Sequence, residues 1–322
     1  MKSKLFKILM SMVCVVALVC SLGMGAFAYE ADNYDLDAVY AMARKSLDQQ
    51  EIQNIMSWHV MYHCYGLHED EMVNIWVNEA ENRATASFGQ NQGFYVGYDS
   101  IWEAYVDGHD TSWLSTAKSY CEKNNIDITG WTDEEILDVY GGVGQLLLHV
   151  TTTAIIEVAE DGQTAKCFWY SPGMIAESGQ SGNTIWEAYG VDFVKEDGVW
   201  KMWHLHMFTD FMGSFYLTLG GNSGGGGGAA PGGGSGEASG SANSNEQQEW
   251  KGEGGSQISS KHDYLYSTQY SEFSSNRLRS EMEIFLPVAY ESWDFADGNY
   301  GPTQEEYESL GIDLDAWYAA HA

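Results

Sequence analysis

Basic side chains are scarce in this chain. Of its 322 residues, 15 are Lys or Arg and 46 are Asp or Glu, so the formal net charge at pH 7 is −31. Nucleic acids and anionic lipid surfaces are bound through clusters of Lys and Arg. The composition therefore argues against both partners. Hydrophobic residues still make up 44% of the chain, which is enough apolar material for a sizeable core and excludes wholesale disorder.

Cysteine is also rare. The chain has five cysteines, too few and too scattered for a scaffold built on disulfides. Two of them, Cys14 and Cys20, lie in an N-terminal segment that we expect to be removed. An odd number then remains, namely Cys64, Cys121 and Cys167, which we expect to be buried thiols rather than nucleophiles.

The first 28 residues have the three parts of a secretory signal. Lys2, Lys4 and Lys7 precede an apolar run at 8–22, and Ala26 and Ala28 offer small residues at the cleavage site. We expect cleavage after Ala28 and a protein that is secreted or associated with the cell envelope, with no stable membrane insertion afterwards. An uncleaved anchor is the alternative, but the apolar run is short for a spanning helix.

A change in composition divides the mature chain. Residues 219–258 are rich in Gly and Ser, which is typical of a flexible linker because such sequence cannot bury apolar surface. The predicted organisation is a signal peptide at 1–28, a folded domain at 29–218, the linker at 219–258 and an extension at 259–322. The extension is rich in aromatic residues, so we expect it to pack on the domain.

Residue periodicity predicts helices first and strands afterwards. Helices are expected at 35–45, 48–66 and 68–77, and another begins near Ser100 with Glu103 completing a capping box. A further helix is expected at 133–140, capped by Thr132 and Glu135. A hairpin is expected at 84–97, and strands at 146–158, 164–172, 184–195 and 199–208. This order indicates an α+β fold with an antiparallel sheet.

Three segments carry a resemblance to a known family. They are IQNIM at 52–56, FGQNQGFYVGYDSI at 88–101 and EDGVWKMWHLH at 196–206. In this order and spacing they resemble SnoaL-like members of the nuclear transport factor 2-like superfamily, over residues 46–212. The resemblance implies a cone-shaped α+β barrel, in which a bent antiparallel sheet wraps around N-terminal helices and leaves an apolar pocket. Such proteins include dehydratases, cyclases, isomerases and modules that only bind, so no cofactor is expected.

The resemblance also indicates catalytic candidates. His149 lies between Leu148 and Val150 on a strand, at a position similar to the general acid/base histidine of bile acid 7α-dehydratase and scytalone dehydratase relatives. Tyr62 and His59 share one face of the first long helix, where a phenol resembles the helix tyrosine of those enzymes. The alternative is that His149 and His59 bond to backbone and that Tyr62 is core.

One feature of those dehydratases is missing. They carry an Asp shortly after the helix tyrosine, whereas this chain has Cys64, Tyr65 and Gly66 there. His63, His68 or Asp192 could take its place, and the sequence does not choose among them. Asp192 lies on an apolar strand, where burial would raise its pKa; an outward, solvated position is the alternative.

A second set of residues is expected to line the pocket. Strict alternation puts His204 and His206 on one strand face with Trp200 and Met202, and Trp76 points inward from the second helix. The two histidines could instead be structural. A metal site built from His149, His204 and His206 is disfavoured because no His-Glu-x-x-His or cysteine spacing supports it, so no metal is expected.

These expectations favour a secreted lyase or isomerase. Its substrate would be a hydrophobic polycyclic or aromatic hydroxy-ketone, with His149 and Tyr62 performing acid–base chemistry without a cofactor. A non-catalytic small-molecule-binding module at the cell surface is the alternative. A homodimer formed through the outer face of the sheet is a further expectation from the resemblance.

Overall fold

The computed structural model describes residues 35–177, 182–215, 262–265, 286–298 and 300–321. The predicted signal peptide and linker lie outside these residues. The chain divides into two units, one ending at Arg44 and one running from Lys45 to the C-terminus. The described part of the first unit is the exposed beginning of one helix. No helix in the described ranges is both long enough and apolar enough to span a bilayer.

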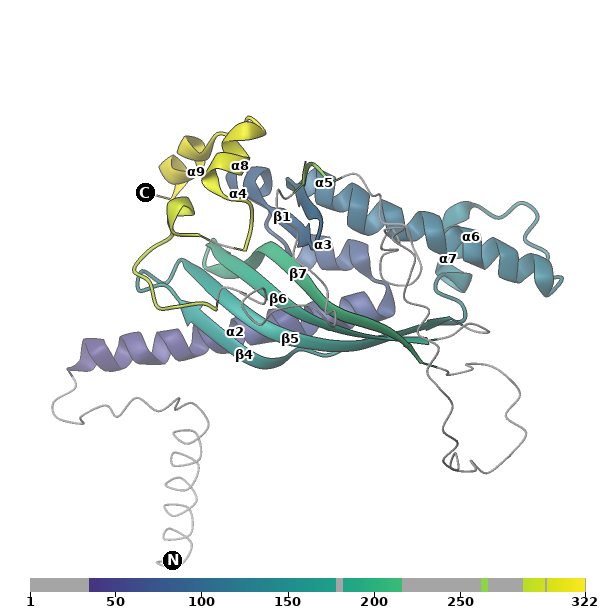
Figure 1. Cartoon of the computed structure of the whole chain (residues 1–322), viewed down its shortest axis with the longest axis horizontal. Helices are drawn as coiled ribbons and strands as arrows, with labels where there is room; N and C mark the ends of the chain where they lie inside the picture. The colour runs from purple at the N-terminus through teal and green to yellow at the C-terminus, as the bar shows by residue number, and fades with distance from the viewer. Residues whose placement is uncertain (1–34, 178–181, 216–261, 266–285, 299, 322) are drawn as a thin grey trace, which may run out of the picture. The chain divides into compact units, whose positions relative to one another are not determined.

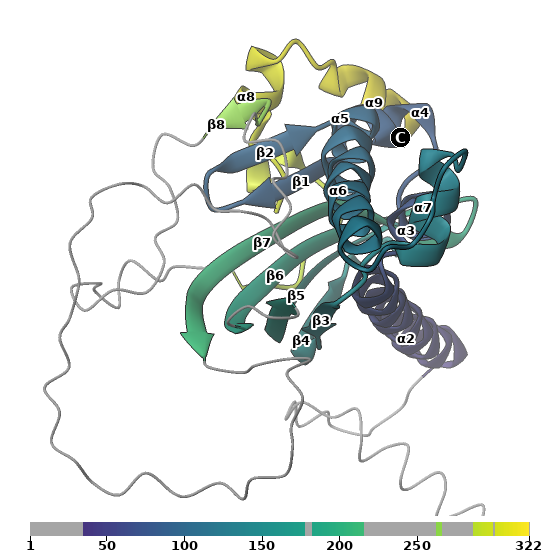
Figure 2. The same ribbon diagram turned by 90° about the vertical axis from the view of Figure 1, so that its right-hand side faces the viewer.

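The helices come early in the chain, as predicted. α2 (Leu36–Tyr65) is one continuous helix, because nothing between Lys45 and Asp48 interrupts the two predicted segments. The others are α3 (His68–Ile75), α4 (Ala80–Thr85), α5 (Tyr98–Trp102), α6 (Gly108–Lys123) and α7 (Asp133–Tyr140). A π-helical turn at Glu103–Asp107 joins α5 to α6, so the two run on almost as one rod (Figure 2).

The two predicted capping boxes have different outcomes. At α7 the Thr132 side chain accepts from the backbone of Glu135 and the Glu135 side chain accepts from the backbone of Thr132, as predicted. At α5 the prediction is wrong, since the helix already begins at Tyr98. Gly97 precedes it with φ 88°, a conformation that glycine adopts without strain and that sets the helix start earlier.

The strands form one mixed sheet. They are β1 (Ser87–Gln90), β2 (Gly93–Val96), β3 (Gln145–His149), β4 (Thr152–Val158), β5 (Thr164–Glu177), β6 (Gly182–Glu196), β7 (Val199–Phe215) and β8 (Tyr264–Leu265). Their order is β3-β5-β6-β7-β1-β2-β8, with β4 also pairing with β5. The α+β class and the bent sheet are confirmed. Two details differ from the expectation: β1 runs parallel to β7, and the sheet is open rather than a closed barrel.

Two faces of this sheet must be distinguished. The helix face is the one on which α2 packs: Trp200 Nε1 donates to Asp48 Oδ1 over 3.0 Å, and Trp169 Nε1 donates to Gln53 Oε1 over 3.1 Å. Figure 1 shows α2 running along this side, passing behind β4 and β5. The tail face is the opposite one, and the C-terminal residues 286–298 and 300–321 pack against it.

A β-bulge in β7 exchanges the two faces. Asp192 of β6 pairs with His204, but the next residue, Phe193, pairs with Met202. Trp203 is therefore an extra residue, and one extra residue inverts the alternation of side chains beyond it. Met202 faces the helices, whereas His204 faces the tail. The prediction that His204 and His206 share a face with Trp200 and Met202 is wrong for this reason.

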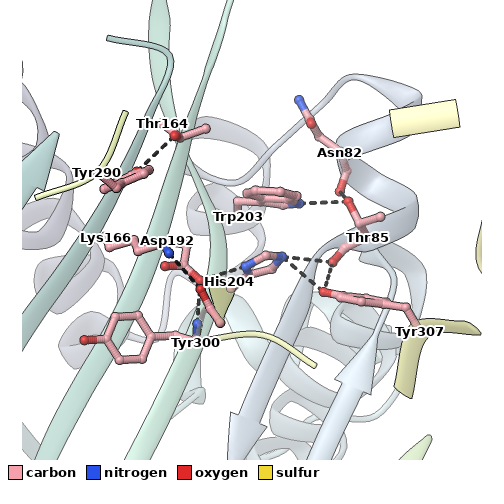
Figure 3. Close-up of polar contacts among 11 residues, drawn as sticks. Asn82, Thr85, Thr164, Lys166, Asp192, Trp203, His204, Tyr290, Tyr300 and Tyr307 are labelled. Carbon is pink, nitrogen blue, oxygen red and sulfur yellow. Dashed lines mark hydrogen bonds and ion pairs between the residues drawn. The ribbon is translucent and has the colours of Figure 1, made fainter. Parts of the chain in front are cut away.

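The tail-face contacts are mostly aromatic. Trp317 stacks on Trp203 with ring centroids 5.0 Å apart and planes within 6°, and Trp317 Nε1 donates to Asn82 Oδ1 over 2.9 Å. The Tyr300 amide donates to Asp192 over 2.7 Å, and the Tyr307 hydroxyl donates to the Thr85 carbonyl over 2.6 Å. Figure 3 shows the hydrogen bonds of Tyr300 and Tyr307. Phe295 and Trp293 complete the packing against Trp203. A fully buried layer therefore joins the C-terminal segment to the sheet.

Candidate active site

The long helix α2 supplies two inward imidazoles. Its buried side chains include His59 and His63, which lie one turn apart and stack with ring centroids 5.9 Å apart. Tyr62 lies between them in sequence but about 100° round the helix from His63. It is half-buried and pairs with the exposed Trp58 at a centroid distance of 5.5 Å. The structure therefore brings His59, but not Tyr62, into the polar interior.

The next helix places a buried carboxylate beside these histidines. Glu71 of α3 is fully buried. Its Oε1 lies 2.7 Å from His59 Nδ1, and its Oε2 accepts from the Tyr105 hydroxyl over 3.2 Å. The same hydroxyl lies 2.6 Å from His63 Nδ1. Trp76 Nε1 also points at Glu71, 3.4 Å away, so Trp76 does face inward as predicted.

A second carboxylate lies on the sheet near His149. Glu187 of β6 is fully buried, and His149 Nδ1 lies 3.9 Å from its Oε2. The carboxylate is held by two hydroxyl donors, Tyr189 at 3.2 Å and Thr209 at 3.1 Å. Gly173, opposite His149 on β5, leaves room for the imidazole, because a Cβ there would lie 2.8 Å from His149 Nδ1.

The two carboxylate groups share one interior. The rings of His63 and His149 lie 5.5 Å apart, edge to face, and His59 lies 5.8 Å from the ring of Tyr189. His68 and His109 add two more buried imidazoles with ring centroids 4.1 Å apart. We call this set the histidine cluster. It consists of His59, His63, His68, Glu71, Tyr105, His109, His149, Glu187 and Tyr189.

His68 has the most unusual environment in the histidine cluster. It is 2% exposed, and neither of its ring nitrogens has a hydrogen-bond partner among the described residues. Burial, followed by the repulsion of His109, His63 and His59, holds its pKa well below 6.5. His68 is therefore neutral at physiological pH, with a nitrogen lone pair exposed to the interior. One donor atom from each of His63, His68 and Glu71 lies within 4.8 Å of the others.

Asp192 does not belong to the histidine cluster. Successive residues of β6 point to opposite faces, so Glu187 and Tyr189 face the helices while Asp192 faces the tail. Asp192 is fully buried rather than solvated. Its Oδ2 lies 2.8 Å from His204 Nδ1 (Figure 3). The other nitrogen of His204 lies 3.2 Å from the Thr85 carbonyl and 3.1 Å from the Tyr307 hydroxyl.

The remaining predicted lining residues divide between the two faces. Trp200 and Met202 are buried on the helix face, and Met202 bridges to Trp76. His206 lies on the tail face, 4.9 Å from the ring of Phe94. Burial lowers the pKa of His206 to about 3. His149, His204 and His206 do not meet at one point, so they do not form a metal triad.

Five members of the histidine cluster were not singled out from the sequence, namely Glu71, Tyr105, His109, Glu187 and Tyr189. Glu187 was signalled by its place among apolar residues on a predicted strand. Glu71 was signalled by its spacing from His68, because side chains three apart share a helix face. Tyr105, rather than Tyr62, places its phenol among the buried histidines, and nothing in its local sequence distinguishes it from a core tyrosine. His63 and His68, two of the three proposed substitutes for the missing Asp, do lie in the histidine cluster.

Several solved structures are similar to this chain, all at low sequence identity. One is a candidate scytalone dehydratase from Novosphingobium aromaticivorans, with 11% identity, a TM-score of 0.36, and coverage of 55% of this chain and 93% of the other. Another is the hexachlorocyclohexane dehydrochlorinase LinA-type3 from Novosphingobium barchaimii, with 14% identity, a TM-score of 0.36, and coverage of 54% and 93%. A nuclear transport factor 2-like protein with a cystatin-like fold from N. aromaticivorans has 16% identity, a TM-score of 0.36, and coverage of 55% and 92%.

No curated protein matches the sequence. A family model does, and it describes a SnoaL-like domain. The match runs over residues 44–206, from α2 to the middle of β7, and so spans all the elements that supply the histidine cluster. The chain belongs to the SnoaL-like domain family.

Proposed function

We propose that the chain is a lyase or isomerase that moves a proton on a small hydrophobic hydroxy-ketone. The observation that carries the proposal is the buried pair of His149 and Glu187. General acid–base catalysis needs an imidazole within reach of a substrate proton and held in one orientation. Glu187 faces the Nδ1 side of His149, and Tyr189 and Thr209 fix that carboxylate.

In this proposal His149 is the catalytic base and Glu187 is a positioning residue. His149 takes the proton from the carbon next to the substrate carbonyl, and charge develops on the carbonyl oxygen. In an elimination, the β-hydroxyl then leaves as water with the proton that His149 returns. The Tyr105 hydroxyl, which lies beside His63 and Glu71, donates to the carbonyl oxygen and stabilises the charge that develops there, which lowers the barrier to removing the proton.

A hydrophobic substrate is supported by the surroundings of His149. β3 lies at the end of the sheet order, and its side chains beside His149 are half-exposed and apolar, namely Leu146, Leu147 and Leu148. An apolar rim next to buried proton-transfer groups suits a ligand that is mostly apolar and carries one or two oxygen atoms. The N-terminal sequence supports action outside the cytoplasm, which is also part of this proposal.

The test is a panel of hydroxy-steroids and phenolic hydroxy-ketones, screened by thermal shift and then by turnover. His149→Gln should lower kcat by roughly 10²- to 10⁴-fold, the usual contribution of a general acid–base group. Glu187→Gln should lower kcat less and should change the pH profile of kcat/KM. His321→Gln, a change in the C-terminal segment, is the matched control. Unchanged turnover in His149→Gln would refute the role of His149. Tight binding without any turnover would favour the binding module instead.

A further inference from the structure

We propose that His63, His68 and Glu71 bind a divalent transition-metal ion. The three side chains come from the end of α2 and from α3, and all are buried. One donor atom from each lies within 4.8 Å of the others. A tetrahedral ion with bonds of about 2.1 Å holds its ligand atoms roughly 3.4 Å apart. The three donors therefore need to approach by little more than about 1 Å, which small side-chain rotations supply.

His68 is the strongest reason to place an ion there. A buried polar atom without a partner costs free energy, and buried imidazoles are normally hydrogen-bonded. Neither nitrogen of His68 has a hydrogen-bond partner in the described part of the chain, although the residue is 2% exposed. The ring is surrounded instead by the rings of His63, Tyr105, His109 and Trp113. A metal ion would give its lone pair the partner that the protein does not.

The other two ligands already have the supporting contacts of a metal site. Residues that bind a metal are usually oriented by hydrogen bonds from a second layer of side chains. Tyr105 lies 2.6 Å from Nδ1 of His63 and so fixes that ring, and the same hydroxyl donates to Glu71. His59 and Trp76 point at the other oxygen of Glu71, at 2.7 and 3.4 Å. Both ligands are thus held in place before any ion arrives.

The donor set indicates the class of ion. Two imidazoles and one carboxylate bind Zn²⁺ in hydrolytic enzymes and Fe²⁺ in oxygenases, and they leave coordination positions open. Hard ions such as Mg²⁺ and Ca²⁺ prefer all-oxygen sites. We therefore expect a borderline divalent ion such as Zn²⁺, Co²⁺ or Fe²⁺. This site differs from the combination of His149, His204 and His206 considered in the sequence.

The ion would also take part in the proposed reaction. Its binding does not depend on the proposed function, but its catalytic role does. The ring of His63 lies 5.5 Å from the ring of His149, so an ion on His63 shares the interior with the proposed base. A divalent ion acting as a Lewis acid polarises a carbonyl oxygen more strongly than a hydrogen bond does. The polarisation of the carbonyl oxygen assigned above to the Tyr105 hydroxyl would then come mainly from the ion.

The test uses the full exported chain without a polyhistidine tag. The protein is stripped with a chelator, reconstituted separately with Zn²⁺, Co²⁺ and Fe²⁺ (the last without oxygen), and desalted. Elemental analysis should find one ion per chain. The Co²⁺ form should show the visible absorption of a low-coordinate site with nitrogen ligands. The many surface carboxylates bind ions weakly and would not produce that spectrum, so it distinguishes the site from adventitious binding.

Variants separate this proposal from the proposed function. His68→Gln should weaken metal binding by more than a hundredfold, whereas His149→Gln should keep the metal and lose turnover. His321→Gln is the control for general loss of imidazole. If His68→Gln fails to fold, the wild-type protein still decides, because a specific ion must raise its melting temperature and a chelator must lower it. Failure to retain any of the three ions, or equal retention by folded His68→Gln, overturns the proposal.

Discussion

Gly190 is a point where the C-terminal segment comes very close to the sheet, and replacing it with Ala tests that contact. A Cβ at Gly190 would lie 2.0 Å from Cδ1 of Tyr300 and 2.4 Å from its Cε1. Carbon atoms in contact are normally about 3.5–4.0 Å apart. The ring of Tyr300 would therefore have to move by about 1.5 Å, which its buried position on the tail face does not allow without displacing the backbone.

The size of the effect follows from what the displacement breaks. Overpacking of a buried position costs about 1–3 kcal/mol. The Tyr300 amide also donates to Asp192 over 2.7 Å, and a hydrogen bond to a charged group contributes about 1.5–3 kcal/mol. Because moving Tyr300 relieves the overpacking at the expense of that bond, the two costs do not add. We expect Gly190→Ala to lower the free energy of unfolding by about 2–3 kcal/mol.

A double-mutant cycle isolates the contact. Urea unfolding gives the free energy of unfolding for the wild type, Gly190→Ala, Tyr300→Ala and the double variant. Since Tyr300→Ala removes the ring that a Cβ would strike, adding Gly190→Ala to it should cost less than about 0.5 kcal/mol, leaving a coupling of roughly 2 kcal/mol. Strictly additive losses would show that the tail segment does not occupy this place and would refute the described packing.

Further predictions concern pH, a buried ion pair, a helix cap and processing. Burial lowers the pKa of His206 to about 3, whereas an unfolded His has a pKa near 6.5. Between these pH values only the unfolded state binds the proton, so the free energy of unfolding should fall by up to about 1.4 kcal/mol for each pH unit below pH 6.5. Urea unfolding at several pH values should show a less steep fall in His206→Gln. Asp48→Ala leaves Lys195, 2.8 Å away, buried and unpaired and should cost about 3–5 kcal/mol in urea unfolding. Thr132→Ala removes a cap of α7 and should cost about 1 kcal/mol. Mass spectrometry of exported protein should find its N-terminus directly after Ala28, and an intact leader would contradict the signal.

Local signals predicted most of the elements. Periodicity gave His59 as an inward side chain of α2, though not its neighbour His63, and turn residues gave the hairpin of β1 and β2. The limits of α7 follow from its capping box. The strand predicted at 146–158 is instead two, β3 and β4, separated by Val150 and Thr151. Within β4 the pairing with β5 shifts by one residue after Thr152, where Thr153 adopts a φ of 58°. The local sequence does not predict such a break, because a Thr in a run of apolar residues usually continues the strand.

The candidate site was less predictable than the fold. His149 and His59 could be named because an imidazole among apolar residues at a regular spacing is conspicuous. The error over His204 and His206 has a specific cause, which is the extra residue Trp203 in β7. A bulge depends on how two strands pair, so the alternation in one strand cannot reveal it. The role of Tyr105 depends on the packing of α2 and α3 against it, which involves residues more than 30 positions away.

The two faces of β6 show why a histidine beside a carboxylate does not by itself identify a catalytic site. Asp192 and His204 are closer together than Glu187 and His149, at 2.8 Å against 3.9 Å. Yet both nitrogens of His204 have hydrogen-bond partners, and Asp192 Oδ2 also accepts a hydrogen bond from the backbone amide of Tyr300. The His204–Asp192 pair is therefore bonded to the C-terminal segment, through the Tyr300 amide and the Tyr307 hydroxyl. On the helix face, the longer separation leaves His149 able to tighten its contact with Glu187 when it takes up a proton, because an imidazolium attracts the carboxylate. A base that gains a stabilising contact only on protonation has the property that proton abstraction requires.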